Sequence, residues 1–387
     1  MREIKISIKP GAVFSALAAA LMITLGGSAF LSAAEAFFPA VHGQSSGDAS
    51  PVSTSPVKIG YFFGGKSYSL FRAYANDYFT REGVNIDFYS QYMLRAGFHK
   101  VPNTCEELRG KKRNAGGKKT YFGKLTGTEI ITAVEQGFFE GGTSGESSFL
   151  MAVNYGSPIV AVAMLGKGEA ERPDKGILIR KGVLIERPED FKGKTLIARR
   201  AGESDSVFLK EFIEDIGLVS GRDVTVMEQV SEDKIEGLMR DKKVDGGLFH
   251  IDTLKKTVAK DLGYVYRKMD WLSPELSQGL LVFRKDFVKS NPEVVSRIVR
   301  AYMKSLKDES SVPEQDRIPD RRNDCAPFAL HFQGMNLPQG SYPPLVRVDM
   351  LNTMQRLLLK YHSVDKEIDL SGFVDNTFVD RAYAEMK

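Results

Sequence analysis

The sequence predicts an α/β protein with two lobes, each a mostly parallel sheet flanked by helices, joined by a hinge that the chain crosses twice. Short apolar strands alternate with helices of about a dozen residues, which is typical of βαβ units. The same alternation restarts after residue 166, and a later apolar strand at 280–284 returns the chain to the first lobe. Such a double crossing allows two lobes to close on each other.

Lobe 1 is expected to comprise residues 56–165 and 275–387. A small-residue turn at 141–148 is expected to open a helix that ends at Gly156. From residue 292 onward the apolar residues follow a mainly helical spacing. In chain order we expect strands at 57–63, 84–88, 159–163 and 280–284, and helices at 70–82, 128–138, 149–155, 294–306 and 345–361.

Lobe 2 is expected to be one continuous segment, residues 166–274. Its polar turn at 187–194 separates two short apolar strands, and its polar turn at 202–206 opens a helix. We expect strands at 176–180, 195–198, 224–226 and 244–249, and helices at 207–216 and 231–240.

The first 36 residues are predicted to be a signal peptide. Basic residues precede an apolar run at about 12–31, and Ala34-Glu35-Ala36 supplies an A-x-A cleavage signal. The run is also just long enough to span a bilayer, so an uncleaved membrane anchor is the alternative. In both cases the remainder is exported. Residues 37–55 are rich in Gly, Ser and Pro and are expected to form a flexible tether.

The composition gives no sign of a nucleic-acid partner, and it leaves open the roles of two cysteines and of a basic insertion. A formal net charge of +4 gives no reason to expect nucleic-acid binding. Cys105 and Cys325 are a candidate disulfide in an oxidising compartment, or else two unrelated thiols. A basic insertion at 95–124 holds nine Lys or Arg against two Glu. It is interpreted either as a solvated loop or as a docking face for an acidic partner or an anionic ligand.

The candidate ligand site consists of four turns, since ligands of open α/β sheets lie beyond the carboxyl ends of the strands. Hydroxyls and N–H groups at helix N-termini suit oxygen-rich ligands. Lys66 or Arg200 can balance a carboxylate or sulfonate, whereas the acidic residues favour an amine or a protonated ring, so the set indicates a zwitterionic or heterocyclic ligand. The alternatives are plain N-capping and, for the aromatics, core packing. The candidates are Lys66, Ser67, Tyr68, Thr143, Ser144, Glu146, Ser147, Arg200, Glu203, Ser204, Asp205, Phe249 and His250.

No catalytic residue, metal ligand or cofactor is predicted. The five histidines are scattered and lack metal-binding spacing. The serine at 144 does not stand in a G-x-S-x-G elbow, and the segment 64–67 lacks the upstream glycine of a P-loop. An enzymatic function is therefore not expected.

Several motifs in order make the chain resemble the periplasmic substrate-binding proteins of nitrate, sulfonate, taurine and pyrimidine-precursor ABC transporters. That family shares its fold with a group of thiamine-pyrimidine synthases. The motifs are VKIGY at 57–61, GSPIVAV at 156–162, PEDFKGKT at 188–195, KVDGG at 243–247 and IDLSGFVDNTFV at 368–379.

The resemblance, which covers most of 56–387, implies a type II-like periplasmic-binding-protein fold with a cleft between its lobes. It implies a periplasmic, monomeric protein that delivers a small organic or anionic solute to an inner-membrane ABC permease. The related synthases would need a cysteine-rich iron site and a pyridoxal cofactor, which two cysteines and an export signal do not fit. A ligand-sensing module for a membrane receptor is the second hypothesis, and an enzyme acting on a small heterocycle is the third.

Overall fold

The computed structural model describes residues 55–62, 65–91, 98–101, 125–167, 173–228, 230, 234–270, 272, 276, 278–310 and 340–387. All of them belong to one compact unit, 51–387. The predicted signal peptide, nearly all of the tether, the two cysteines and most of the basic insertion lie outside the described residues. Within the part that is described, no helix is both long and apolar enough to cross a membrane.

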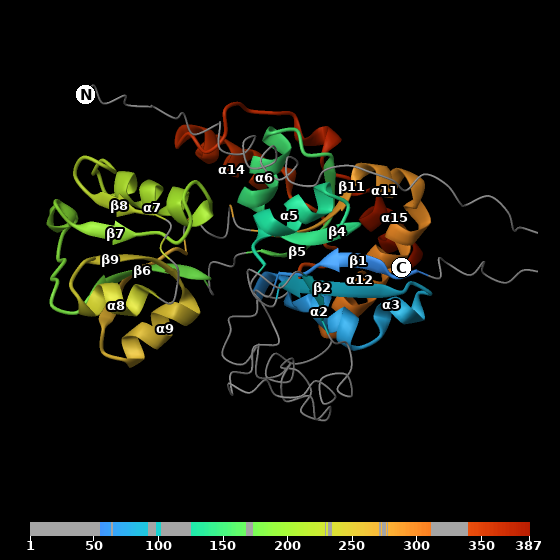
Figure 1. The fold of residues 1–387 in the computed structure, drawn as a ribbon, viewed down its shortest axis with the longest axis horizontal. Coiled ribbons are helices and arrows are strands. Elements are labelled where there is room, and N and C mark those ends of the chain that lie inside the picture. The colour runs from blue at the N-terminus through green and yellow to red at the C-terminus, as the bar shows by residue number, and fades with distance from the viewer. Residues whose placement is uncertain are drawn as a thin grey trace, which may run out of the picture. The chain divides into compact units, whose positions relative to one another are not determined.

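Sheet A has six described strands in the order β3-β2-β1-β4-β11-β5 (Figure 1). β1 pairs in parallel with β2 and with β4, and β11 runs antiparallel between β4 and β5. β3 is an antiparallel edge strand. The bounds are β1 Val57–Gly60, β2 Ile86–Gln91, β3 Phe98–Lys100, β4 Gly141–Gly145, β5 Ile159–Lys167 and β11 Gln278–Arg284.

Sheet B has five described strands in the order β10-β6-β9-β7-β8. β9, β7 and β8 are parallel neighbours, while β6 runs antiparallel to both β9 and β10. The bounds are β6 Lys175–Arg180, β7 Thr195–Ile197, β8 Thr225–Met227, β9 Gly246–His250 and β10 Gly263–Lys268.

The two sheets share one plan, which confirms the two-lobed α/β fold. In each, the strand that follows a crossing between the sheets (β11 in sheet A, β6 in sheet B) runs opposite to its two neighbours. Among the described strands, four of six in sheet A and four of five in sheet B run in a common direction. Each sheet therefore contains both parallel and antiparallel strand pairs, although most of its strands run in the same direction.

Helices cover both faces of sheet A. Along β11, Leu280 and Val282 join a core cluster that includes residues of α5 and α6, whereas Leu281 and Phe283 join one that includes α2 and α12. This is the alternation of side chains expected of a strand buried on both faces. The helices are α2 Tyr68–Ala75, α3 Tyr78–Arg81, α5 Gly127–Glu135, α6 Glu146–Asn154, α11 Lys285–Ser290, α12 Pro292–Ser310, α14 Val348–Lys360 and α15 Thr377–Glu385.

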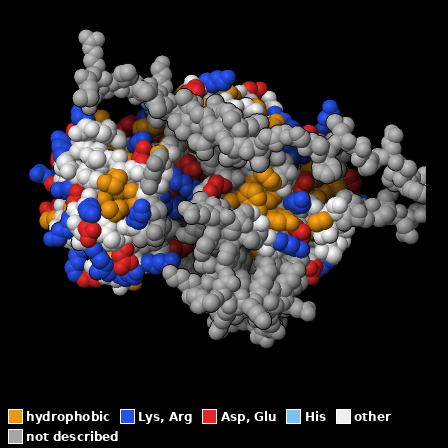
Figure 2. Space-filling model, in the orientation of Figure 1, with side chains coloured by type: hydrophobic (Ala, Val, Ile, Leu, Met, Phe, Trp, Pro, Cys, Tyr) orange, Lys and Arg blue, Asp and Glu red, His pale blue; other side chains and the backbone are white. Residues whose placement is uncertain are grey.

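Sheet B is accompanied by helices α7, α8 and α9, and the surface charges there pair locally. Figure 2 shows Lys, Arg, Asp and Glu interspersed on its visible face. On α8, Glu236 contacts both Arg240, at 3.0 Å, and Lys260, which follows α9. The helices are α7 Ser204–Asp215, α8 Ile235–Arg240 and α9 Ile251–Ala259, and the 3-10 helices among the described residues of both lobes are η2 Gly65–Ser67, η3 Pro188–Phe191 and η6 Leu370–Gly372.

Two local predictions were wrong. The helix expected at 70–82 is broken into α2 and α3, because Asp77 takes the left-handed conformation with φ 58°. The turn expected at 141–148 contains a strand of the sheet interior, β4, instead. The small residues there permit close packing, since a Cβ on Gly142 would stand 2.2 Å from Ile130 Cγ2.

Some elements were not expected from the sequence. They are β3, which lies within the basic insertion, and α9, β10 and α15. β3 has three residues and β10 alternates imperfectly, with a register shift between Val265 and Arg267, so neither produces a clear period-two pattern.

Candidate functional site

Helices α6, α7 and α9 begin at or shortly after the end of a strand, and none of these three has a side-chain cap. α6 follows β4 directly, α9 follows β9 directly, and α7 begins seven residues after the end of β7. Their N-cap residues, Gly145, His250 and Glu203, make no side-chain capping hydrogen bond. The same holds for Ser67 at the start of α2. The N–H groups of a first turn and the positive end of the helix dipole are therefore not covered by a side-chain cap at these four places.

Helix α5 provides the contrast. The Thr126 hydroxyl accepts a hydrogen bond from Glu129 N at 3.1 Å, and the Glu129 carboxylate accepts one from Thr126 N at 2.7 Å, which is a complete capping box. The starts of α3, α8, α11, α14 and α15 also lack a side-chain cap, so a missing cap does not by itself mark a ligand site. The N-capping interpretation of the candidate residues does not hold for the N-cap positions of α2, α6, α7 and α9.

A buried ionic cluster lies at the start of α7. Asp205 is 5% exposed and accepts a hydrogen bond from Arg199 Nε at 2.8 Å. A second guanidinium nitrogen of Arg199 lies 2.7 Å from the carboxylate, and Lys175 Nζ lies 3.2 Å from it. Lys175, itself 3% exposed, also lies 3.5 Å from Ser204 Oγ. Two cations therefore share one buried carboxylate.

The cluster is ionised. Burial alone would raise the pKa of Asp205, but Arg199 and then Lys175 hold it well below its ordinary value. Burial would likewise lower the pKa of Lys175, but Asp205, Asp174 and Glu146 raise it. Each member keeps its charge because the other supplies the compensating one.

His250 lies beside this cluster as a neutral imidazole. It ends β9 and is the N-cap of α9. Burial, reinforced by the positive charge of Arg199, lowers the pKa of His250 to about 3, and the carboxylate of Asp205 offsets only part of that effect. A neutral imidazole can both donate and accept a hydrogen bond.

Contacts from the sheet A lobe reach the same region. Lys66 Nζ, in η2, lies 3.4 Å from the carboxylate of Asp174, which directly precedes β6. The Thr128 hydroxyl on α5 donates to Glu203 Oε1 at 3.1 Å, and the other oxygen of Glu203 accepts from Arg200 at 2.8 Å. Side chains carried by both sheets therefore surround the start of α7.

Glu146, the first residue of α6, is a further buried carboxylate, 3% exposed. Its Oε2 accepts a hydrogen bond from Gln278 N at 3.1 Å. Gln278 begins β11, the strand that returns the chain to sheet A. The negative charge of Glu146 also acts on Lys175, which connects it electrostatically to the cluster.

The remaining predicted residues have structural partners. Thr143 Oγ1 accepts a hydrogen bond from Phe62 N at 2.7 Å, and Ser144 Oγ donates to Gly145 O at 3.1 Å. Ser67 donates to Phe62 O. Ser147 is buried on α6, and Tyr68 and Phe249 lie in hydrophobic clusters.

Two charged residues of the cluster, Lys175 and Arg199, were missed. Lys175 stands at the first position of an apolar strand, and Arg199 follows the short strand β7 next to a residue that was named, Arg200. A lysine that opens an otherwise apolar strand was the available signal, because buried lysines occur almost only where they are paired.

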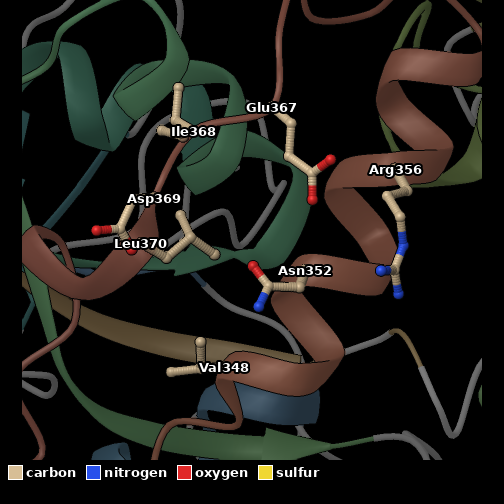
Figure 3. Close-up of a pocket in the computed structure, with 7 residues that line it drawn as sticks. All are labelled: Val348, Asn352, Arg356, Glu367, Ile368, Asp369 and Leu370. Atoms are coloured by element: carbon tan, nitrogen blue, oxygen red, sulfur yellow. The ribbon is translucent and has the colours of Figure 1, made fainter.

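A separate hollow of about 480 Å³ contains none of the predicted residues (Figure 3). Val348, Asn352 and Arg356 line it from successive turns of α14, and residues 367–370 line it from the other side. Arg356, Glu367 and Asp369 are solvent-exposed there, which makes it a polar surface groove.

Comparisons with known proteins agree with this architecture. The structure of the periplasmic aliphatic sulphonate binding protein SsuA from Escherichia coli matches with a TM-score of 0.58 and 14% identity, covering 84% of this chain and 92% of that one. The periplasmic nitrate-binding protein NrtA from Synechocystis matches with a TM-score of 0.60 and 11% identity, covering 86% and 89%. The desulfurization enzyme DSZB matches at 0.52 and 12%, covering 86% and 100%.

The protein therefore has the fold of the periplasmic binding proteins. A family model described as NMT1/THI5 like matches residues 125–316, so this part of the chain is similar to that family. None of the curated proteins compared with the chain matches it.

Proposed function

We propose that this is an exported solute-binding protein. It captures a small organic or anionic solute between its lobes and delivers it to an inner-membrane ABC permease, acting in the periplasm as a monomer. The observation that carries the proposal is the ionised cluster to which both lobes contribute, beside the starts of α6, α7 and α9. Polar groups held in this way suit a small polar ligand.

The comparisons support the same proposal. The two binding proteins named above have this fold, and by their names one binds an aliphatic sulphonate and the other nitrate. The part of the chain that is similar to the NMT1/THI5-like family contains the candidate residues of α6, α7 and α9. The division into lobe 1, at 56–165 and 275–387, and lobe 2, at 166–274, stays part of the proposal.

Ligand capture would work by a shift between open and closed forms. The contacts Lys66–Asp174 and Thr128–Glu203 join residues carried by different sheets, so opening the site would break them. A solute that contacts both lobes only when they are closed stabilises the closed form by its differential affinity. The permease would then recognise that form.

Thermal shift measurements on the chain without its predicted signal peptide test the proposal. The protein is unfolded and refolded to remove any carried solute, and the panel holds nitrate, bicarbonate, sulfonates, taurine, aminopyrimidines and polyamines. A ligand at 100 times its Kd adds about 2.7 kcal/mol to stability. One hit that is lost when Asp205 is changed to Asn supports the proposal, whereas a flat panel on protein shown to be empty contradicts it.

An enzyme acting on a small heterocycle is the second candidate. The likeness to the desulfurization enzyme DSZB favours it, as does the neutral imidazole of His250 beside charged groups. Incubation of the panel compounds with the protein, followed by mass spectrometry, distinguishes the two. Turnover that is lost in His250→Ala favours the enzyme, and binding without turnover favours the binding protein.

A further inference from the structure

We propose that the solute of this site carries a cationic nitrogen that binds Glu146, and that the net charge of the solute is zero or positive. This rests on the proposed function and narrows it, because it removes simple anions from the candidate solutes. Three features of the site carry it: the balance of its charges, the surroundings of Glu146, and the helix starts that face the cluster.

The described charged residues of the site carry no excess of positive charge. Four are cationic and, with Asp252 in the first turn of α9, five are anionic, while His250 is neutral. Every one of the four cations already contacts a carboxylate. The pairs are Lys66 with Asp174 at 3.4 Å, Lys175 with Asp205 at 3.2 Å, Arg199 with Asp205 at 2.7 Å and Arg200 with Glu203 at 2.8 Å, and Glu146 and Asp252 are the remaining anions.

A simple anion could therefore bind a cation of the site only by competing with the carboxylate that this cation already contacts. To bind Lys175 or Arg199 it would have to displace Asp205, and a buried carboxylate that loses its partner is costly. It would also bring a net negative charge beside Glu146 in a region where water screens little. A solute without net negative charge avoids both costs.

Glu146 is an anion without an ion-pair partner among the described residues. Its Oε2 accepts a hydrogen bond from Gln278 N at 3.1 Å. The side chain is nevertheless 3% exposed. Buried carboxylates are ordinarily paired or hydrogen-bonded several times, so a cationic N–H group is the partner that this one lacks.

The opposite end of the solute is expected to be oxygen-rich. The first turns of α7 and α9 have no side-chain caps, and their N–H groups and dipoles favour partial or full negative charge. A zwitterion, or a polar neutral molecule with a protonatable nitrogen, satisfies both ends. This geometry also orients the solute, with nitrogen towards α6 and oxygen towards α7 and α9.

Isothermal titration calorimetry with matched compounds tests the inference. Each pair differs only in an amine against a hydroxyl: taurine against isethionate, β-alanine against 3-hydroxypropionate, and 4-(aminomethyl)pyrimidine against 4-(hydroxymethyl)pyrimidine, with nitrate as the simple anion. We expect at least one amine to bind tenfold or more tightly than its hydroxyl partner. In Glu146→Gln that preference should fall at least tenfold, because the amide keeps the size and the acceptor but not the charge.

Glu309→Gln is the matched control. Glu309 is also 3% exposed, but it lies at the end of α12 beside Arg72, at 3.6 Å, outside the site. This variant should keep the amine preference. If Glu146→Gln does not fold, the comparison within each pair on the unmodified protein decides alone.

The outcomes separate the inference from the function it rests on. If each hydroxyl compound binds as tightly as its amine partner, or if nitrate binds as tightly as the amines, the inference is overturned and the solute-binding role stays intact. An amine preference that survives in Glu146→Gln overturns the role of that residue. Binding of none of these compounds counts against both.

Discussion

Changing Asp205 to Asn should destabilise the protein more than any other single change in the ionic cluster. The amide has nearly the same shape, so packing is kept while the negative charge is lost. Lys175, 3% exposed, and Arg199 then remain as two cations without their shared carboxylate. Removing one partner of a buried pair costs about 3–5 kcal/mol. With an unfolding entropy of about 2 cal/mol/K per residue, this lowers Tm by roughly 4–8 °C.

Lys175→Met supplies the internal comparison. Asp205 keeps Arg199 at 2.7 Å, and the methionine retains the packing of the lysine stem, whose amine lies 4.7 Å from the centre of the Phe208 ring. We expect a cost of about 1.5 kcal/mol, the value for one hydrogen bond to a charged group. Asp205→Asn should therefore lose more stability than Lys175→Met, because only Asp205→Asn leaves buried charges without their partner.

The assay is urea unfolding of both variants and the parent protein at pH 7 and at several lower pH values. The folded state holds the pKa of Asp205 well below its ordinary value. A carboxyl group whose pKa is lowered by folding stabilises the folded protein at pH values above its unfolded-state pKa, near 3.9. That stabilisation is lost as the pH falls through the folded-state pKa. The difference in the free energy of unfolding between the parent protein and Asp205→Asn should therefore be constant above pH 5 and decrease below pH 4. Equal stability of the two at pH 7, or a larger cost for Lys175→Met, would refute the reasoning.

Three further predictions concern single residues. Between pH 7.5 and 5.5 the protein should lose about 1 kcal/mol through His250, because the unfolded imidazole takes up a proton near pH 6.5 while the folded one stays neutral to about pH 3. In His250→Asn this loss should vanish from urea titrations at the two pH values, and its persistence would contradict the burial of the ring. Gly246→Ala should cost more than about 3 kcal/mol, because its Cβ would stand 2.2 Å from Leu178 O, whereas Gly237→Ala in α8 has nothing within 4 Å and should stabilise by about 0.5–1 kcal/mol. Denaturation midpoints in the reverse order would show that close packing does not explain Gly246. Thr126→Ala should lower stability by about 1 kcal/mol through loss of the α5 cap, and an unchanged midpoint would contradict the capping box.

Local pattern was sufficient for the lobes and for the position of much of the site. The alternation of apolar strands and helices predicted most strands of both sheets, because period and burial are properties of a short segment. The same alternation placed Glu203, Ser204 and Asp205 in a turn at the carboxyl side of a strand. The structure finds them at the start of α7.

Local pattern failed where distant contacts decide the conformation. The segment 141–145 has the composition of a turn, but Gly141 and Gly142 are required by neighbours from β11 and α5, and the segment forms an interior strand. Asp77 ends α2 through a left-handed conformation that the helical spacing around it does not reveal.

The sequence by itself determined the fold class, the turns that present polar groups, and the acidic and basic residue types that they carry. The tertiary structure alone decided which charges meet. It joined Lys175 and Arg199 to Asp205, kept the imidazole of His250 neutral, and left Glu146 with a backbone hydrogen bond and no counter-ion among the described residues. The physical reason is that charge pairing depends on distance and burial, which are set by strands and helices far apart in the chain.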